Sequence, residues 1–324
     1  METSSVSAES FRGDIITERL EAAGRPLTIA HGGVDMEPST ATFRALTAAA
    51  EAAFGRISGG GIEAALAAVS VLEDDPSFNC GFGSVLARDG SVETDGAVSC
   101  GHSRRAVGVG AVPGLRHPAR LAHRVFQEEN AVLLVGRQAA EYAASLGIST
   151  EDLATEEQRL ALAALAIDPS RSVFTGRSVP SETIGCLVVD GQGRVASASS
   201  TGGLLGKLPG RVGDACIAGA GFWTDERFGV LCSGSGEVAI SRHLARSVAD
   251  RASRMDILDA TVSALEEVVR SGRTVCAVVA VDASTGAVAT AHNGSSFPVV
   301  VRSAQKAHQL GGTNHRHSPR GEGQ

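Results

Sequence analysis

The chain alternates between short apolar runs and glycine- or proline-rich breaks, and the sharpest boundary lies just before an apolar run at 183–189. Turn residues Asp-Gly-Gln-Gly follow at 190–193, and a second strand-like run covers 195–199. Two β-prone runs around a glycine turn predict a buried β-hairpin. The preceding segment, about 167–182, is polar and broken by proline and glycine, which is typical of a flexible linker. The pattern therefore puts a threonine, Thr183, where a linker meets a core strand.

The same periodicities predict the other elements of the chain. Apolar residues at helical spacing predict helices over 14–23, 41–54, 62–72, 117–129, 138–146, 151–167, 237–252 and 255–270. Runs rich in β-branched residues predict strands over 26–30, 132–136, 275–282 and 287–292. We expect residues 1–12 to be disordered, and the Gly-, Ser- and His-rich end, with His308, His315 and His317, to be a solvated tail. This mixture of helices and strands indicates an α+β protein.

The position of Thr183 suits one kind of nucleophile. If the peptide bond before it is cut, the threonine gains a free α-amine with a pKa near ~8. That amine lies beside the hydroxyl of the same residue and can remove its proton, as in N-terminal threonine nucleophiles. The alternative is that Thr183 is only a β-branched residue at the start of a strand.

Glycine-rich motifs follow Thr183 in a fixed order. They are Ser-Ser-Thr-Gly-Gly at 199–203, Gly-Arg-Val-Gly-Asp at 210–214, Gly-Ala-Gly at 219–221 and Cys-Ser-Gly-Ser-Gly-Glu at 232–237. This order resembles the threonine-dependent N-terminal-nucleophile hydrolases, specifically the isoaspartyl peptidase / plant-type L-asparaginase family. The resemblance implies a four-layer αββα sandwich made as one precursor. It also implies a cut before Thr183 into an N-terminal subunit, 1–182, and a C-terminal subunit, 183–324, which together form one domain.

The resemblance implies a role for each matching residue. Thr183 would be the nucleophile, and Thr201 would hydrogen-bond its hydroxyl. Arg211 would hold a substrate α-carboxylate as a bidentate pair, and Asp214 would bind the α-ammonium group, so that together they recognise an aspartyl unit. The alternative is that Arg211 and Asp214 form a surface ion pair, which contributes under about 1 kcal/mol.

A second set of residues would complete the site. Gly234 would supply a backbone N–H, and Ser233 a hydroxyl, to a developing oxyanion. Asn79 maps to an active-site asparagine of the family, and Gly236 belongs to the substrate-binding set. The glycine after Thr201 favours the asparaginase-type branch, because the aspartylglucosaminidase branch typically has asparagine there. The alternative is that these glycines only form turns.

Residues 72–86 closely resemble the family loop that holds a structural sodium ion through backbone carbonyls, for which Leu72, Glu73 and Phe78 are candidates. The alternative is a helix end followed by a turn, with Glu73 in a solvated acidic run. No cysteine or histidine spacing suggests zinc, so we expect no catalytic metal. The six cysteines are expected to be buried free thiols.

Besides Val-Ser-Cys-Gly at 98–101, where the family usually has Val-Met-Asp-Gly, the chain departs from the family pattern at three places that bear on the site. Ser181 and Glu182 precede the nucleophile, where the family often has His-Asp or a glycine. Ser233 and Ser235 stand where the family has threonine and histidine in Thr-Gly-His-Gly-Glu. Asn-Gly-Ser-Ser-Phe at 293–297 replaces a segment that usually carries methionine. These departures bear on self-cleavage, oxyanion geometry and substrate scope, in that order.

Composition narrows the possible partners. The 29 basic residues against 36 acidic ones give a formal charge of −7, which argues against nucleic acids and anionic membranes because both need a basic surface. The start has no basic-then-apolar leader and no apolar run is long enough to span a bilayer, so a cytoplasmic location is the default expectation. The resemblance implies a small-molecule or dipeptide substrate and a dimer of cleaved heterodimers.

The function that the sequence favours is a self-processing amidohydrolase that cleaves β-aspartyl peptide bonds and the side-chain amide of L-asparagine. One alternative is a related β-amide hydrolase, such as an N-glycosyl-asparagine amidase. The other is an uncleaved, non-catalytic scaffold of the same fold.

Overall fold

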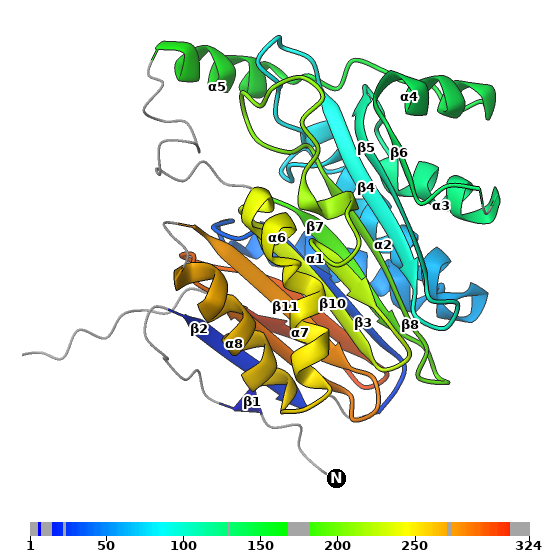
Figure 1. Cartoon of the computed structure of the whole chain (residues 1–324), viewed down its shortest axis with the longest axis vertical. Helices are drawn as coiled ribbons and strands as arrows, with labels where there is room; N and C mark the ends of the chain where they lie inside the picture. The colour runs from blue at the N-terminus through cyan, green and yellow to red at the C-terminus, as the bar shows by residue number, and fades with distance from the viewer. Residues whose placement is uncertain are drawn as a thin grey trace, which may run out of the picture.

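Two β-sheets, with helices packed against them, make up the described part of the chain (Figure 1). The computed structural model describes residues 6–7, 15–21, 24–128, 130–167, 182–270 and 274–311. The linker expected at about 167–182 lies almost wholly outside these ranges. Most of residues 1–12, His315 and His317 also lie outside them.

The larger sheet contains the hairpin predicted from the sequence. Its eight strands are, in spatial order, β14 (Ala307–Leu310), β13 (Val299–Ser303), β3 (Leu27–His31), β7 (Ile184–Val189), β8 (Val195–Thr201), β4 (Glu93–Cys100), β5 (Arg105–Pro113) and β6 (Leu133–Val135). Neighbouring strands are antiparallel except β5 and β6. The hairpin is confirmed as β7 and β8, and its register pairs Ile184 with Ser200. Thr183, just before β7, therefore lies beside Thr201, the last residue of β8.

The smaller sheet has six strands, all paired antiparallel. In spatial order they are β1 (Val6–Ser7), β2 (Ile16–Glu21), β12 (Ala287–His292), β11 (Cys276–Asp282), β10 (Phe228–Gly234) and β9 (Phe222–Thr224). Each sheet contains strands from before and after Thr183, so neither half of the chain forms a sheet of its own.

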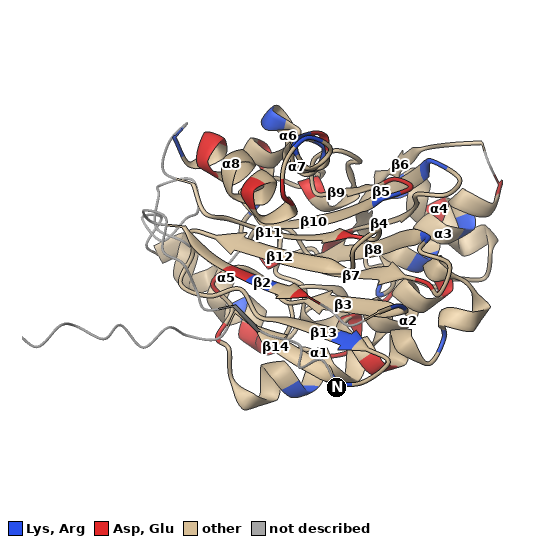
Figure 2. Cartoon of the chain, turned by 90° about the horizontal axis from the view of Figure 1, so that it is seen from below, with Lys and Arg blue, Asp and Glu red and all other residues tan. Residues whose placement is uncertain are grey.

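Two groups of helices cover the sheets. The helices α1 (Thr40–Phe54), α2 (Gly61–Glu73), α3 (Pro118–Glu128) and α4 (Gly136–Ser145) pack against the larger sheet, and α7 (Leu244–Ala252) and α8 (Ile257–Arg270) pack against the smaller one. Figure 2 shows α1 and α2 below the strands and α7 and α8 above them. The short α6 (Gly236–Arg242) follows β10, and α5 (Glu156–Ile167) precedes the linker with none of its side chains buried.

An apolar cluster joins the two sheets. It includes Leu187 from β7 and Leu231 and Val279 from β10 and β11, together with Phe297. All four are fully buried, and β10 also contacts β7 and β8 directly. Two further clusters lie between each sheet and its own helices. The packing between the sheets holds the end of β10 close to the start of β7, where Thr183 lies.

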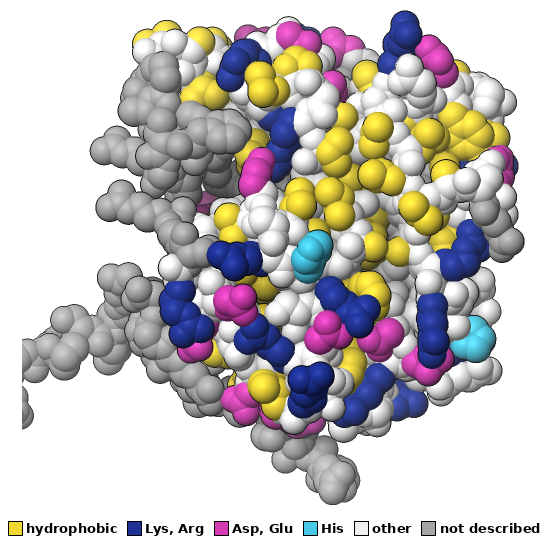
Figure 3. All heavy atoms as spheres, viewed as in Figure 1, with side chains coloured by type: hydrophobic (Ala, Val, Ile, Leu, Met, Phe, Trp, Pro, Cys, Tyr) yellow, Lys and Arg dark blue, Asp and Glu magenta, His cyan; other side chains and the backbone are white. Residues whose placement is uncertain are grey.

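Apolar and charged side chains are unevenly distributed on one face of the molecule. Figure 3 shows hydrophobic side chains gathered over the upper half of one face and charged ones over the lower half. The exposed apolar residues include Val132 and, on the edge strand β6, Leu133 and Val135. No helix in the described ranges is long and apolar enough to cross a membrane. All six cysteines are free thiols, five of them buried and Cys100 partly so.

Three predictions near the ends of the chain are wrong. Disorder was expected over 1–12, but Val6–Ser7 form the strand β1, which pairs with β2. Within the helix predicted over 14–23, Ile16–Glu21 form the strand β2, because pairing with β12 over six residues stabilises the extended backbone. His308 lies in β14 opposite Val301, so it is not part of a solvated tail. The partner of β2 is distant in the sequence, whereas β14 pairs with the neighbouring strand β13.

Another predicted element differs in its internal structure. The helix expected over 237–252 is two helices, α6 and α7, because His243 between them has a left-handed φ of 50°. Strands β4, β5, β9, β10 and β13 were not predicted. The sequence of β4, Glu-Thr-Asp-Gly-Ala-Val-Ser-Cys, has small and polar residues buried on both faces, so it lacks a hydrophobic alternation.

Removing part of the cluster between the sheets should destabilise the protein strongly. We expect Leu231→Ala to lower the free energy of unfolding by roughly 2–5 kcal/mol, because it leaves a cavity in a closed core. Urea unfolding of Thr183→Ala protein, in which the chain stays in one piece, measures the change. Leu160→Ala on α5 is the matched control, since Leu160 is 62% exposed and its loss should change stability by under about 0.5 kcal/mol. Equal shifts for both variants would contradict the assigned core.

Candidate active site

Three strand ends meet around Thr183. Thr183 precedes β7, Thr201 ends β8, and Ser233 and Gly234 end β10 in the other sheet. The side chains of Thr183, Thr201 and Ser233 are all buried. The structure thus brings together the four residues that the sequence analysis named as catalytic.

Hydrogen bonds hold the peptide bond between Glu182 and Thr183 from both sides. The Thr201 hydroxyl donates to the Glu182 carbonyl oxygen at 3.0 Å, and the Thr183 N–H donates to Ser233 Oγ at 3.3 Å. The Gly203 N–H in turn donates to Thr201 Oγ1 at 3.1 Å. Thr201 was expected to bond the Thr183 hydroxyl, but in the continuous chain its hydroxyl bonds the Glu182 carbonyl oxygen instead.

Ser233 and Gly234 are fixed by the strands around them. Ser233 Oγ also accepts the Val34 N–H at 3.1 Å, so two backbone groups orient this hydroxyl. Gly234 has a φ of 124°, and a Cβ there would overlap the Val275 carbonyl oxygen and lie 2.8 Å from Cys276 Cα. Only glycine fits this backbone conformation and this close approach.

Glu182, the residue that departs from the family pattern, is packed against the glycine-rich segment after β3. A Cβ on Gly33 would lie 2.5 Å from both Cα and Cβ of Glu182. Burial raises the pKa of Glu182 to about 7, and Asp35 acts in the same direction while the Asn79 backbone N–H opposes both. The residue before the nucleophile is therefore enclosed on several sides.

Asn79 supports the turn after Thr201. Its Nδ2 donates to the Gly203 carbonyl at 2.8 Å, and its Oδ1 accepts the Val85 N–H at 3.0 Å. The Gly202 N–H donates to the Asn79 carbonyl at 2.8 Å, and a Cβ on Gly202 would overlap Asn79 Oδ1. Asn79 is thus next to the site as predicted, with its amide engaged by backbone groups. The place of Gly202 leaves no room for an asparagine side chain.

Arg211 and Asp214 form a charged corner beside Gly236. Arg211 Nε and Nη2 donate to Glu237 Oε1 at 3.0 and 2.9 Å, a partner that the sequence analysis did not foresee. Asp214 is buried, and its Oδ2 has no hydrogen-bond partner among the described residues. A Cβ on Gly236 would lie 2.8 Å from Asp214 Oδ1 and 3.0 Å from Arg211 Nη2, so the glycine keeps this corner open.

The charge state of Asp214 depends on its surroundings. Burial raises its pKa to about 7, while the Arg211 guanidinium acts to lower it. The alternative of a solvated surface pair between Arg211 and Asp214 is therefore wrong. A buried carboxylate oxygen without a partner fits a cationic ligand such as an ammonium group.

A comparison with models of protein families identifies the family of the chain. A family model described as asparaginase matches residues 22–311. The chain belongs to the asparaginase family.

Individual relatives extend this comparison. The plant-type L-asparaginase of Pyrobaculum calidifontis is 34% identical over 268 residues, covering 79% of this chain and 90% of the relative. The isoaspartyl peptidase/L-asparaginase of Bos taurus is 34% identical over 236 residues, covering 68% of this chain and 75% of the relative. The plant-type L-asparaginase of Pyrococcus furiosus is 36% identical over 207 residues, which cover 59% of this chain and 66%, just under two thirds, of that relative.

The sequence analysis gave no role to three buried charged residues of this asparaginase-family chain, although Glu93-Thr94-Asp95-Gly96 resembles an acidic segment of the family. Lys207 is fully buried and donates from Nζ to the Glu93 carbonyl at 2.8 Å, and Asp95 accepts the Gly213 N–H at 2.7 Å. A lysine within a glycine-rich loop, and two acids two residues apart at 93–95, were the available signals. Neither signal indicated which residues these side chains contact, because the contacts join segments more than a hundred residues apart.

The loop after α2 has backbone carbonyl oxygens packed closely against two of its glycines. A Cβ on Gly83 would overlap the Phe78 carbonyl oxygen and lie 2.6 Å from that of Pro76. A Cβ on Gly81 would overlap the Glu73 carbonyl oxygen and lie 2.8 Å from that of Arg116. This cradle of backbone oxygens fits a hard cation. Over the described residues, no group of three or more His, Cys, Asp or Glu side chains is arranged to hold a metal.

The Glu73 side chain is not in a solvated acidic run. It is fully buried, accepts a bond from His117 Nδ1 at 2.8 Å, and burial raises its pKa. The alternative reading of this loop as a solvated acidic turn is therefore wrong for Glu73.

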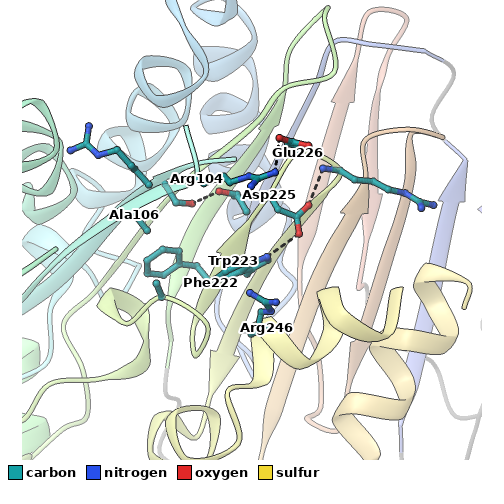
Figure 4. A pocket seen from close by; sticks show the side chains of 12 residues that line it. Arg104, Ala106, Phe222, Trp223, Asp225, Glu226 and Arg246 are labelled. Atoms are coloured by element: carbon teal, nitrogen blue, oxygen red, sulfur yellow. Dashed lines mark hydrogen bonds and ion pairs between the residues drawn. The ribbon is translucent and has the colours of Figure 1, made fainter. Parts of the chain in front are cut away.

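A separate hollow lies away from Thr183. It has a volume of about 520 Å³ and lies beside β9, next to Arg104, Trp223 and Arg246 (Figure 4). Arg246 stacks over the Trp223 ring, and Arg104 pairs with Glu226. Ser99, near the end of β4 away from Asp95, also lines it. None of the predicted site residues lines this hollow.

The turn after Thr201 should not tolerate a larger residue. We expect Gly202→Ala to displace Asn79 and Ser84 and to lower the urea midpoint, since a Cβ would also lie 2.6 Å from Ser84 Cβ. Gly191→Ala, in the turn at the other end of the β7–β8 hairpin, is the matched control, because nothing lies within 4 Å of its Cβ position. The close packing around Asn79 would be refuted if both alanine variants unfolded at the midpoint of the unchanged protein.

Proposed function

We propose that this chain is a self-processing amidohydrolase. It cuts itself between Glu182 and Thr183 and then hydrolyses the side-chain amide of L-asparagine and β-aspartyl peptide bonds. The observation that carries the proposal is the double hold on the Glu182–Thr183 peptide bond by Thr201 and Ser233. Relatives named plant-type L-asparaginase and isoaspartyl peptidase/L-asparaginase support the choice of substrates.

Self-cleavage would proceed by an N-to-O acyl shift. The Thr183 hydroxyl attacks the Glu182 carbonyl carbon, and the Thr201 hydroxyl, 3.0 Å from that carbonyl oxygen, stabilises the developing oxyanion. The C–N bond then breaks as the proton released by the Thr183 hydroxyl passes to the nitrogen, which becomes the α-amine. Ser233 Oγ, 3.3 Å from this nitrogen, orients it. Water hydrolyses the resulting ester and leaves a Glu182 carboxylate and a free Thr183.

The mature site would use the same groups on a substrate. The Thr183 amine takes the proton of its own hydroxyl, which attacks the side-chain carbonyl of the substrate and forms an acyl-enzyme. The Gly234 N–H and the Ser233 hydroxyl are the proposed oxyanion donors. The leaving group takes up this proton. It departs as ammonia from asparagine, or through its α-amino group from a β-aspartyl peptide. Water then hydrolyses the acyl-enzyme and releases aspartate.

Recognition of the aspartyl unit would fall to the charged corner. The Arg211 guanidinium would bind the α-carboxylate, exchanging with or sharing its bond to Glu237, whose side chain is 55% exposed. The Asp214 carboxylate would bind the α-ammonium group, and Gly236 would leave space for the substrate. Because the surroundings of Gly202 leave no space for an asparagine side chain, we favour the asparaginase-type branch over N-glycosyl-asparagine amidases.

We further propose the quaternary and structural features that the family suggests. The fold is the four-layer αββα sandwich of N-terminal-nucleophile hydrolases, and two cleaved heterodimers associate. The loop with Leu72, Glu73 and Phe78 binds a structural sodium ion through backbone carbonyls, in support of which the Phe78 and Pro76 oxygens converge on Gly83.

Self-cleavage should give two fragments. We expect incubation of the purified protein to yield 1–182 and 183–324 by intact mass spectrometry. Thr183→Ala should stay in one piece, since it lacks the attacking hydroxyl. Thr201→Val should slow the cut by about two orders of magnitude, as for a lost oxyanion donor. A full-length chain that persists in the unchanged protein after prolonged incubation would contradict the proposal.

Cleaved protein should then act on a small panel of amides. We expect release of aspartate from L-asparagine and β-aspartyl dipeptides and little turnover of N-glycosyl asparagine. Thr183→Ala serves as the control for contaminating activity. Turnover confined to N-glycosyl asparagine would transfer the chain to the alternative β-amide class.

Asp214 should set the acidic limb of the activity profile. With a pKa of about 7 in the free protein, its carboxylate is neutral at lower pH and cannot pair with an ammonium, so kcat/KM should fall as pH drops below about 7. A bound ammonium favours the ionised carboxylate, so this limb should weaken in kcat. Asp214→Asn should lower kcat/KM and leave the Thr183 amine as the remaining titrating group, whereas Asp89→Asn on an exposed turn should keep the original profile.

The raised pKa of Asp214 also predicts how stability depends on pH. The folded pKa of Asp214 lies above the ordinary value of 3.8, so its protonated form favours the folded state and this contribution is lost as pH rises through about 7. Asp214→Asn should therefore be more stable than the unchanged protein at pH 8 while binding substrate less well. An Asp214→Asn variant that is less stable at pH 8 would contradict the buried, partnerless carboxylate.

A further inference from the structure

The loop that carries Arg211 and Asp214 is tied to the start of β4. Lys207 Nζ donates to the Glu93 carbonyl at 2.8 Å, and the Gly210 N–H donates to the Glu93 carboxylate at 2.8 Å. The Gly213 N–H donates to Asp95 Oδ2 at 2.7 Å. Arg211 lies between the last two of these ties. Its backbone position is therefore set by two acids on a neighbouring strand.

Both carboxylate oxygens of Asp95 accept backbone hydrogen bonds. It is fully buried, and its Oδ1 accepts the Ala111 N–H at 2.7 Å. Ala111 has a left-handed φ of 48°, and the β4–β5 register shifts between Thr94 and Gly96. The local strain directs an N–H onto the carboxylate, so Asp95 links a bulge in β5 to the Arg211 loop.

Lys207 supplies the positive charge beside these acids. Its side chain is fully buried, and a Cβ on Gly203 would lie 2.9 Å from its Nζ. Burial lowers the pKa of Lys207, whereas Asp95 and Glu93 act to raise it. A buried ammonium needs such nearby negative charge, and a buried carboxylate needs the cation in return.

We propose that Asp95 is a positioning residue that sets substrate affinity by fixing the loop that carries Arg211 and Asp214. The inference rests on the function proposed above for that loop. Asp95 is also the cross-strand neighbour of Thr201 in the β4–β8 register. The Thr201 bond to Glu182, however, is set by β8 and by Gly203, so self-cleavage does not depend on the aspartyl-binding corner.

This separation defines the experiment. Asp95→Asn keeps the shape but replaces one accepting oxygen with an NH₂ group, so one of the two backbone bonds is lost. We expect KM for L-asparagine to rise roughly ten- to hundredfold, the range for a small displacement of binding groups, while kcat and the rate of self-cleavage stay near those of the unchanged protein. A residue with only a structural role would instead slow self-cleavage as well.

Asp190→Asn is the matched control. Asp190 also accepts two backbone N–H groups, from Gln192 and Arg194, in the turn at the far end of the β7–β8 hairpin. It should leave KM unchanged. If Asp95→Asn does not fold, the double variant Asp95→Asn/Lys207→Met removes both buried charges, and it should fold with KM still raised.

Hydrogen exchange gives a readout without turnover. In Asp95→Asn the amide of Gly213 or of Ala111 should exchange faster than in the unchanged protein, and Asp190→Asn should leave both amides as they were. If the unchanged protein neither cuts itself nor hydrolyses asparagine, the proposed function fails, and faster exchange still supports the hold of Asp95 on the loop. Unchanged exchange, unchanged KM, or self-cleavage slowed in proportion to KM would each overturn the inference.

Discussion

The register that pairs Ile184 with Ser200 is the constraint on which the rest of the site depends. A slip of one residue would turn every side chain of β8 to the opposite face, and the Thr201 hydroxyl would no longer lie 3.0 Å from the Glu182 carbonyl. The packing of the two sheets through Leu187 and Leu231 then brings Ser233 to the other side of the same peptide bond. Backbone pairing and core packing, rather than flexible loops, thus position the reacting groups.

Charge is distributed around this frame at a cost to stability. Asp214 has a buried oxygen with no partner within the described ranges, and Glu182 is enclosed against Gly33 with a raised pKa. Such groups destabilise the folded state until a ligand or a reaction changes their surroundings. The three apolar clusters supply the stability that tolerates them. The residues proposed to react or to bind substrate are therefore ones that selection for stability alone would not favour.

The sequence indicated the hairpin, the boundary at Thr183 and the family, because each depends on local patterns or on motifs in a fixed order. The family was confirmed, and Thr183, Thr201, Ser233 and Gly234 do lie together. The sequence gave no role to Asp95 and Lys207, because their partners lie on segments distant in the chain. Glu237 is the last residue of the motif at 232–237, but its bond to Arg211 depends on how α6 turns after β10. The roles of the site residues stay predictions.

The placement of β3 has a consequence for how a cleaved form of the chain would assemble and persist. This strand, from before Thr183, is hydrogen-bonded to β13 on one side and β7 on the other, and β4 and β2 likewise pair with β8 and β12. A cut ahead of Thr183 would leave two pieces whose strands interdigitate in both sheets, so they could not separate without unzipping them. Before the cut, folding is a reaction of one chain; afterwards, refolding needs two pieces to meet and depends on concentration. The cut would make assembly a one-way event, and persistence of the mature form would rest on slow unfolding rather than on reversible equilibrium.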